Sequence, residues 1–173
     1  MNWVTPGLCS AALVAAFGVG GLRLNATYSL PLGIYRTTPD PSARLIEFCP
    51  TGLAAIESTG RGYRGRSWSC PDGEAPLLKP IVATEGDIVE TTPAGIVVNG
   101  RVLPNTAPLF RDSQGRELTP WPFGAYVVDS GHVWVASTYN KGSYDSRYLG
   151  PIPLTAIRAR LKPVFTYNPG GQR

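Results

Sequence analysis

Short runs in which apolar and polar residues alternate recur along the chain after residue 24, separated by residues typical of turns. Alternation with a period of two is typical of strands that bury one face. The dipeptide Asn99-Gly100 divides one of these runs and is a strong signal for a two-residue hairpin turn. The pattern therefore predicts a mainly β domain with antiparallel strands, a barrel or a sandwich, over residues 25–173. We expect its strands at Leu45–Cys49, Leu77–Glu90, Gly95–Leu103, Ala125–Asp129 and His132–Ser137.

Two segments between these runs lack a clear period. The first covers about residues 50–76, is rich in Gly, Arg and Ser, and is expected to be a loop-rich insertion. The second, Pro104–Phe123, is polar and contains several prolines. Near the end, Gly150–Lys162 is expected to form a last strand or a short helix, and Asn168–Arg173 a frayed tail.

The N-terminal segment 1–24 differs from everything that follows it. Trp3–Leu22 holds 20 consecutive residues without a charge, a length that just spans a hydrocarbon core of about 30 Å. We therefore expect a hydrophobic helix, either a retained membrane anchor or a cleaved signal peptide, with the membrane as a partner. Arg23 and Arg36 follow the segment instead of preceding it, which does not favour export under the positive-inside rule. Its glycines leave a buried core helix as the alternative.

Composition supports the β prediction and excludes one class of function. The 173 residues include 20 Gly and 17 Pro, which favour β structure with many turns over a helical bundle. The formal net charge is only +4, and the basic residues are scattered with no aromatic stripe between them. Nucleic-acid binding is therefore not expected.

The three cysteines bear on the cellular compartment. Cys9 lies in the apolar segment, whereas Cys49 and Cys70 lie in sequence rich in Gly and Pro. We expect a disulfide between Cys49 and Cys70, typical of an exported protein, with two free thiols as the alternative. One His and two separated Cys cannot supply four zinc ligands, so no metal is expected.

The residues that could carry chemistry are few. The chain has no phosphate-cradling Gly-Lys-Ser/Thr loop, no His-Glu-x-x-His and no Gly-x-Ser-x-Gly motif. Its single histidine, His132, lies in a strand-like run, where a structural role is the better interpretation. A peptidase would then need another base, and lysine can serve when burial lowers its pKa. Lys79 lies in an apolar, strand-like stretch; an edge lysine with its amine in water is the alternative.

Three motifs, in order along the chain, give these residues a context. The first runs from Asn25 to Tyr35 as Asn-Ala-Thr-Tyr-Ser-Leu-Pro-Leu-Gly-Ile-Tyr, the second runs from Lys79 to Gly86-Asp87-Ile-Val, and the third is Ser143-Tyr-Asp-Ser-Arg-Tyr-Leu-Gly. Together they resemble the nucleophile, lysine and closing motifs of type I signal peptidases, peptidase family S26. The likeness is closest to the TraF-type peptidases of conjugative transfer. It implies a signal-peptidase-like β domain behind an N-terminal hydrophobic helix.

Some residues depart from the pattern of the general signal peptidases. Leu30 follows the first-motif serine where Met is usual, and Pro80 follows the lysine where Arg is typical. The segment Ser137–Gly142 stands in place of a Gly-Asp-Asn lead-in to the third motif. These departures favour the transfer-type branch over a housekeeping signal peptidase.

The resemblance implies the catalytic roles. Ser29 is expected to be the nucleophile and Lys79 its general base. The oxyanion of the tetrahedral intermediate would be held by the backbone N–H of Ser29 and by the hydroxyl of Thr27. No cofactor is implied.

The third motif is expected to support this pair. Ser143 would orient the lysine amine, and Asp145 would form an ion pair with Arg147. Asp145 is included among the catalytic residues, although a direct role and a purely structural pairing both stay open. A carboxylate close to the lysine would raise its pKa, which favours support at a distance.

The resemblance also implies a serine endopeptidase that processes exported precursor proteins, so the expected partner is a peptide or protein precursor. In the transfer-type branch this precursor is a propilin, matured for conjugative DNA transfer and in some systems cyclised. The catalytic domain would lie in the periplasm, on the bacterial inner membrane if the anchor is kept and soluble if it is cleaved. A general type I signal peptidase and a non-enzymatic periplasmic accessory protein of a transfer or secretion apparatus are the alternatives.

Overall fold

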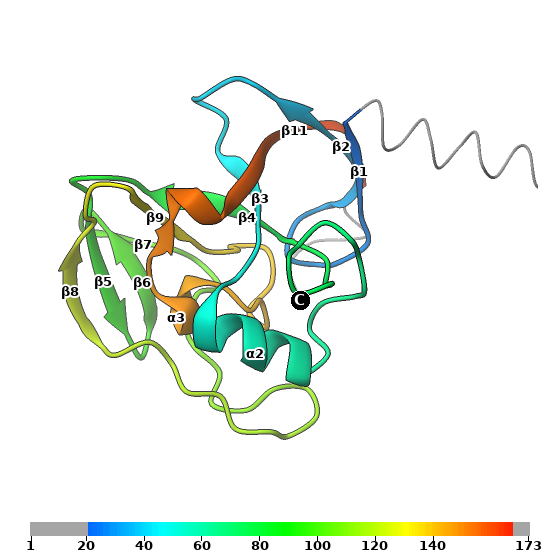
Figure 1. Ribbon diagram of the computed structural model, residues 1–173. Coiled ribbons are helices and arrows are strands. Elements are labelled where there is room, and N and C mark those ends of the chain that lie inside the picture. Colours follow the sequence, from blue (N-terminus) through cyan, green and yellow to red (C-terminus); the bar gives the residue numbers. More distant parts are fainter. Residues whose placement is uncertain (1–20, 168–173) are drawn as a thin grey trace, which may run out of the picture.

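The computed structural model describes residues 21–167, which fold into two antiparallel sheets and two short α-helices (Figure 1). The larger sheet has seven strands in the order β1-β2-β11-β3-β4-β9-β10, and the smaller has four in the order β7-β6-β5-β8. This architecture confirms the predicted mainly β, antiparallel fold class.

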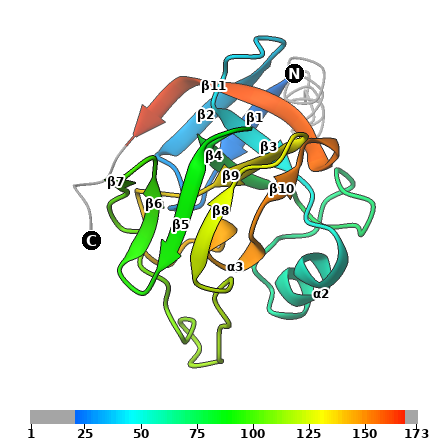
Figure 2. The same cartoon turned by 90° about the vertical axis from the view of Figure 1, so that its left-hand side faces the viewer.

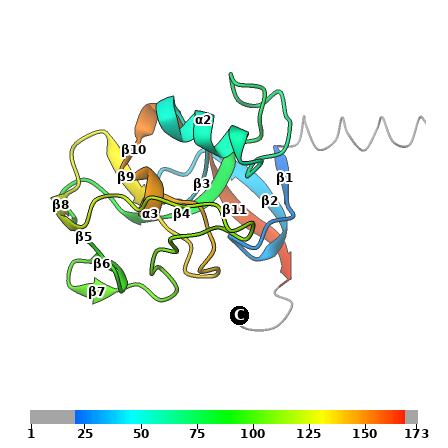
Figure 3. The same ribbon diagram turned by 90° about the horizontal axis from the view of Figure 1, so that it is seen from below.

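The larger sheet contains β1 (Leu22–Asn25), β2 (Leu32–Thr38), β3 (Leu45–Phe48), β4 (Leu77–Ala83), β9 (His132–Val135), β10 (Ile152–Pro153) and β11 (Ile157–Tyr167). The smaller sheet, which faces the viewer in Figure 2, contains β5 (Ile88–Thr92), β6 (Gly95–Val98), β7 (Arg101–Val102) and β8 (Gly124–Val127). The helices are α2 (Gly52–Gly60), α3 (Ser146–Leu149) and the 3-10 turn η1 (Leu154–Ala156). Helix α2 lies apart from the smaller sheet in every view (Figure 3).

The predicted strand Leu77–Glu90 is in fact two strands, one in each sheet. A turn at residues 84–87 separates β4 from β5, and Gly86 adopts a positive φ of 83° there, a conformation that favours glycine. The Asp87 carboxylate accepts hydrogen bonds from both the N–H and the hydroxyl of Thr84, at 2.7 and 3.2 Å. Because β5 pairs with β6 and β8, this turn passes the chain from the larger sheet to the smaller.

The other strand predictions agree with the structure to within a few residues. The hairpin expected at Asn99-Gly100 joins β6 to β7, and both turn residues have positive φ. The final segment Gly150–Lys162 contains both of the expected forms, since η1 precedes β11, which continues to Tyr167.

Helix α2 was not predicted, because the segment 50–76 was expected to be irregular. The helix leaves Leu53 and Ile56 exposed to solvent and buries Ser58. Its apolar residues therefore form no buried stripe, and the period of 3.6 that marks an amphipathic helix is missing from the sequence.

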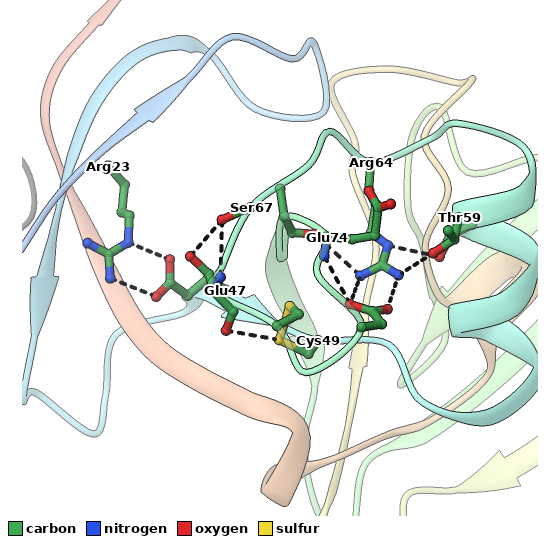
Figure 4. Close-up of a disulfide and its surroundings, with 12 residues drawn as sticks. Arg23, Glu47, Cys49, Thr59, Arg64, Ser67 and Glu74 are labelled. Carbon is green, nitrogen blue, oxygen red and sulfur yellow. Dashed lines mark hydrogen bonds and ion pairs between the residues drawn. A yellow bond between two sulfur atoms is a disulfide. The ribbon is translucent and has the colours of Figure 1, made fainter. Parts of the chain in front are cut away.

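The rest of this segment is held by a disulfide and by one buried arginine (Figure 4). Cys49, just after β3, is bonded to Cys70, with the two Cα atoms 5.7 Å apart. The Arg64 guanidinium donates to the hydroxyls of Ser58 and Thr59 in α2, at 3.0 and 2.9 Å. It also pairs with the carboxylate of Asp72 in the same loop, so the loop is tied to both β3 and α2.

Among residues 21–167, buried apolar side chains form three clusters. The largest lies along β3, β4 and β9 and includes Phe48, Ile81 and Val135. A second cluster joins the two sheets, because Trp134 points to the opposite side of β9 from Val135 and packs with residues of the smaller sheet. The third is small and contains Leu30, Tyr35 and Leu161, close to the connection between β1 and β2.

Most of the predicted N-terminal hydrophobic segment lies outside the described residues. Leu22, Arg23 and Leu24, at its end, belong to β1 and pair with β2. Within residues 21–167, none of the helices has the length and apolar character needed to cross a membrane.

The disulfide should contribute to the stability of the domain. Replacing both Cys49 and Cys70 by Ala is expected to lower the free energy of unfolding by about 3 kcal/mol, because the unfolded chain regains the freedom of the closed loop. Thermal unfolding measured with and without reductant checks this. Reductant should lower the melting temperature of the wild type and leave that of the double variant unchanged; a wild type insensitive to reductant would contradict the bond.

Candidate active site

Ser29 lies in the connection between β1 and β2, in a tight turn held together by Asn25. The Asn25 side chain is buried, and its amide donates to the backbone carbonyls of Thr27, Leu30 and Pro31, at 2.9, 3.2 and 3.0 Å. The two hydrogen atoms of one amide group are thus shared among three carbonyls, which fixes the shape of the turn and presents the Ser29 hydroxyl to β4.

Lys79 is buried because of its position in β4. Alternate residues of a strand face the same side, so Lys79 shares its face with the core residues Leu77 and Ile81. Strand β4 lies between β3 and β9 and is not an edge strand. The residue is only 3% exposed, so the alternative of an edge lysine with its amine in water is wrong.

The Lys79 amine contacts the Ser29 hydroxyl, with Nζ 2.7 Å from Oγ. Burial lowers the pKa of Lys79 from 10.5 to about 8, because desolvation disfavours the charged amine. The Asp145 carboxylate acts against this shift, and the Arg147 guanidinium acts with it. Near neutral pH about a tenth of the lysine is therefore uncharged. A neutral amine within hydrogen-bond distance of a hydroxyl is the arrangement that a general base requires.

Ser143 is buried, and its hydroxyl contacts the Ser29 hydroxyl that Lys79 also contacts. Its Oγ lies 3.3 Å from Ser29 Oγ, whereas the resemblance placed this hydroxyl at the lysine amine. In the structure Lys79 and Ser143 are both partners of the Ser29 hydroxyl. Ser143 therefore reaches the lysine only through the oxygen that the two share.

Asp145 and Arg147 form a wholly buried ion pair beside the site. Arg147 Nε and Nη2 each donate to the Asp145 carboxylate at 2.8 Å, and the Ser137 N–H donates to it at 2.9 Å. Over residues 21–167, no hydrogen bond joins this carboxylate to Ser29 or Lys79. The pair explains how a carboxylate can lie near Lys79 without keeping its amine charged, because the guanidinium offsets the negative charge.

Thr27, the expected oxyanion donor, is exposed at the surface of the turn. Its hydroxyl donates to Asn25 Oδ1 at 2.9 Å. To hold an oxyanion, this hydroxyl would have to leave Asn25, and the role stays a prediction.

Two residues at the site were not singled out from the sequence as functional. Asn25 begins the first motif, and its position there was the only signal for its role. Ser137 begins the segment that departs from the family pattern, and its hydroxyl donates to the backbone carbonyl of Ser29 at 2.6 Å. The departure of this segment from the family pattern was thus the only sequence signal that could have pointed to Ser137.

His132 is not part of this constellation. It opens β9, and its Nδ1 lies 3.2 Å from the carbonyl oxygen of Ser130 in the preceding turn. Among the residues that the structure describes, no group of three or more His, Cys, Asp or Glu side chains is placed to hold a metal ion.

The fold and these three motifs define a class of protein, an antiparallel β domain in which a serine meets a buried lysine. The chain belongs to the signal peptidase family, peptidase S26, whose model matches residues 41–166. The matched range contains Lys79 and Asp145 and begins after Ser29.

Relatives along almost the whole chain confirm the resemblance to the TraF-type branch. The chain is 37% identical over 174 residues to a probable conjugal transfer protein TraF of Sinorhizobium fredii, which covers 98% of this chain and 90% of the relative. It is 32% identical over 167 residues to a plasmid transfer protein TraF of Escherichia coli, with 95% and 93% covered. A conjugal transfer protein TraF of Agrobacterium tumefaciens is 38% identical over 164 residues, with 92% and 90% covered.

Among solved structures, the chain resembles a signal peptidase I from Enterococcus faecalis. The TM-score is 0.40 at 16% sequence identity, with 73% of this chain and 100% of the other covered. A likeness at this level carries no conclusion of its own.

The buried amine of Lys79 should reduce the stability of the fold. We expect Lys79→Met, which keeps a long apolar side chain, to raise the free energy of unfolding at pH 7 by up to about 3 kcal/mol. The native pKa is about 8 and the ordinary value 10.5, so the unfolded chain binds more protons between these values. Wild-type stability should therefore rise across this window, and the advantage of the variant should disappear above it.

Denaturant unfolding at pH 7, 9 and 10.5 measures this effect. Lys141→Met is the matched control, because Lys141 is exposed and its replacement should change stability by less than about 0.5 kcal/mol. A Lys79→Met variant no more stable than the wild type at pH 7 would show that the amine is not desolvated.

Proposed function

We propose that this chain is a serine endopeptidase in which Ser29 is the nucleophile and Lys79 the general base. The observation that carries the proposal is the 2.7 Å contact between the Ser29 hydroxyl and a buried amine whose pKa is lowered to about 8. Neither group would be reactive alone, because a serine hydroxyl needs a base and an ordinary lysine is protonated at neutral pH.

The neutral Lys79 amine takes the proton of the Ser29 hydroxyl as Oγ attacks the scissile carbonyl carbon. The negative charge that develops on the carbonyl oxygen is stabilised by the Ser29 N–H and by the Thr27 hydroxyl once it has turned from Asn25. The protonated amine then gives its proton to the leaving amine, and the acyl group stays on Ser29 as an ester. Water releases a linear product; an amine of the substrate itself would release a cyclic one.

Asp145 acts in this proposal as a positioning residue. Its carboxylate is occupied by Arg147 and by the Ser137 N–H, so it has no free oxygen to exchange a proton with the substrate. A buried ion pair of this kind also keeps the surrounding loop in one conformation, because separating the two charges would leave each unpaired.

The substrate that fits best is an exported precursor, and we assign a propilin matured for conjugative DNA transfer. Support comes from the family, whose members are signal peptidases, and from relatives called conjugal or plasmid transfer proteins. The disulfide between Cys49 and Cys70 is typical of an oxidising compartment such as the periplasm. Together with the apolar N-terminal segment, this favours a protein bound to the inner membrane with its catalytic domain in the periplasm.

Processing of the pilin precursor in cells tests the proposal against its rivals. Ser29→Ala, Lys79→Ala and Lys79→Arg should each stop maturation, the last because an arginine stays charged and cannot accept a proton. Immunoblots for precursor and mature pilin, with the enzyme's own abundance measured beside them, report the outcome. Continued maturation with Ser29 replaced would favour a non-enzymatic accessory role, and cleavage of unrelated secretory precursors would favour a general signal peptidase.

The pH dependence of cleavage should show the titration of Lys79. We expect kcat/KM to rise with pH through a midpoint of about 8 and to fall tenfold per pH unit below it, because only the neutral amine is a base. Cleavage of a synthetic precursor peptide by the purified protein gives the profile. His132→Asn should leave the midpoint unchanged; a midpoint near the ordinary histidine pKa of about 6.5 that vanishes in this variant would identify a different base.

A further inference from the structure

Ser137 joins the Asp145–Arg147 ion pair to the backbone of Ser29. It lies just beyond the end of β9, and no part of it is exposed to solvent. Its hydroxyl donates to the carbonyl oxygen of Ser29 at 2.6 Å, and its own N–H donates to the Asp145 carboxylate at 2.9 Å. One buried residue therefore contacts both the ion pair and the residue that carries the nucleophile.

The direction of the Ser137 hydroxyl is determined by its other partners. The N–H groups of Tyr139 and Asn140 donate to Ser137 Oγ, at 3.1 and 3.2 Å. A hydroxyl has one hydrogen atom and two lone pairs, so these two donors occupy its accepting capacity. Its only hydrogen atom is left for the Ser29 carbonyl, and the bond to Ser29 has a single orientation.

The turn that carries Ser137 is anchored at both ends to the ion pair. At one end the Ser137 N–H bonds to Asp145, and at the other the carbonyl of Asn140 accepts from Arg147 Nη2 at 3.3 Å. Arg147 Nη1 also donates to the carbonyl of Lys141 at 2.8 Å. Because the two charges are buried and paired, this turn has little freedom to move relative to Asp145.

We infer that Ser137 is a positioning residue for the nucleophile, which transmits the rigidity of the buried ion pair to the Ser29 backbone and holds Ser29 Oγ at the Lys79 amine. The carbonyl that Ser137 binds and the attacking oxygen belong to the same residue, so rotation of one peptide unit displaces the other. A displacement of 1 Å at a reacting atom can lower a rate by about 100-fold. Through Ser137, Asp145 can also influence the position of Ser29 without contacting Ser29 itself.

The inference rests on the proposed function, and its test distinguishes failure of the inference from failure of that function. Purified wild type, Ser29→Ala, Ser137→Ala and Ser137→Thr are compared in cleavage of the same precursor peptide, each with its melting temperature. We expect Ser137→Ala to lower kcat by about 10- to 100-fold with KM changed less than twofold, because binding precedes the misaligned step. Ser137→Thr restores the hydroxyl and should recover most of kcat at 25 °C.

Ser58→Ala is the matched control. Ser58 is equally buried, and its hydroxyl also donates to a backbone carbonyl, that of Ala55, and accepts from Arg64. It lies in α2 and has no contact with Ser29, so its loss should lower the melting temperature without changing kcat. This control separates a loss of alignment from a general loss of stability.

The midpoint of the pH profile distinguishes positioning from a purely structural role. If Ser137→Ala only loosened the packing, water would reach Lys79 and the midpoint would shift from about 8 toward 10.5. A lower kcat with the midpoint still near 8 supports positioning. A shifted midpoint would overturn the inference and leave the proposed function intact. So would a kcat for Ser137→Ala within twofold of the wild type while Ser29→Ala is inactive. Activity in Ser29→Ala would instead contradict both the inference and the proposed function.

Discussion

Burial of the Lys79 amine is the constraint on which the rest of this site depends. An amine in water holds its proton at neutral pH, whereas removal from solvent lowers its pKa and lets it act as a base there. The fold achieves this by placing Lys79 on the core face of an inner strand, between Leu77 and Ile81. Such burial allows no uncompensated negative charge nearby, because a free carboxylate would hold the proton on the amine. The close pairing of Asp145 with Arg147 meets this requirement.

The buried polar side chains that surround Lys79 in the described residues all have hydrogen-bond partners, and this gives the site its order. The Asn25 amide serves three carbonyls of the turn that carries Ser29, and the Ser137 hydroxyl serves the Ser29 carbonyl itself. In a dry environment an unpaired polar group is costly, so each of these bonds disfavours any other arrangement of the turn. The Ser29 hydroxyl is thereby held at the Lys79 amine by groups that the proposed mechanism does not use.

The segment 50–76 is connected to the site through aromatic contacts. Tyr144, between Ser143 and Asp145, donates its hydroxyl to Glu57 in α2 at 2.7 Å. Its ring lies 4.9 Å from that of Tyr63, in the loop that follows the helix. The disulfide and the buried Arg64 hold this loop to β3 and α2. The insertion thus packs against the third motif and helps to fix its backbone, although none of its residues forms a hydrogen bond with Ser29 or Lys79.

Local sequence patterns were enough to predict much of the secondary structure and to identify the three motifs. Alternating residues and the Asn99-Gly100 turn were sufficient for the β class and for most strands, because both signals are local. They did not reveal α2, whose apolar residues face solvent, or the division of Leu77–Glu90 between two sheets. In that run both halves alternate, and the turn between them is made by Gly86, with its positive φ, and by the contacts between Thr84 and Asp87.

The surroundings of each functional group follow from contacts between distant parts of the chain, which the sequence does not reveal. Whether a lysine in an apolar stretch is buried depends on whether its strand is an inner or an edge strand, and strand order is set by pairings far apart in the sequence. The same holds for Ser143, whose contact is the Ser29 hydroxyl, and for Ser137, which sequence comparison marked only as a departure from the family pattern. A motif names the groups that meet in a site, whereas their hydrogen-bond partners and pKa values follow from the three-dimensional packing that brings them together.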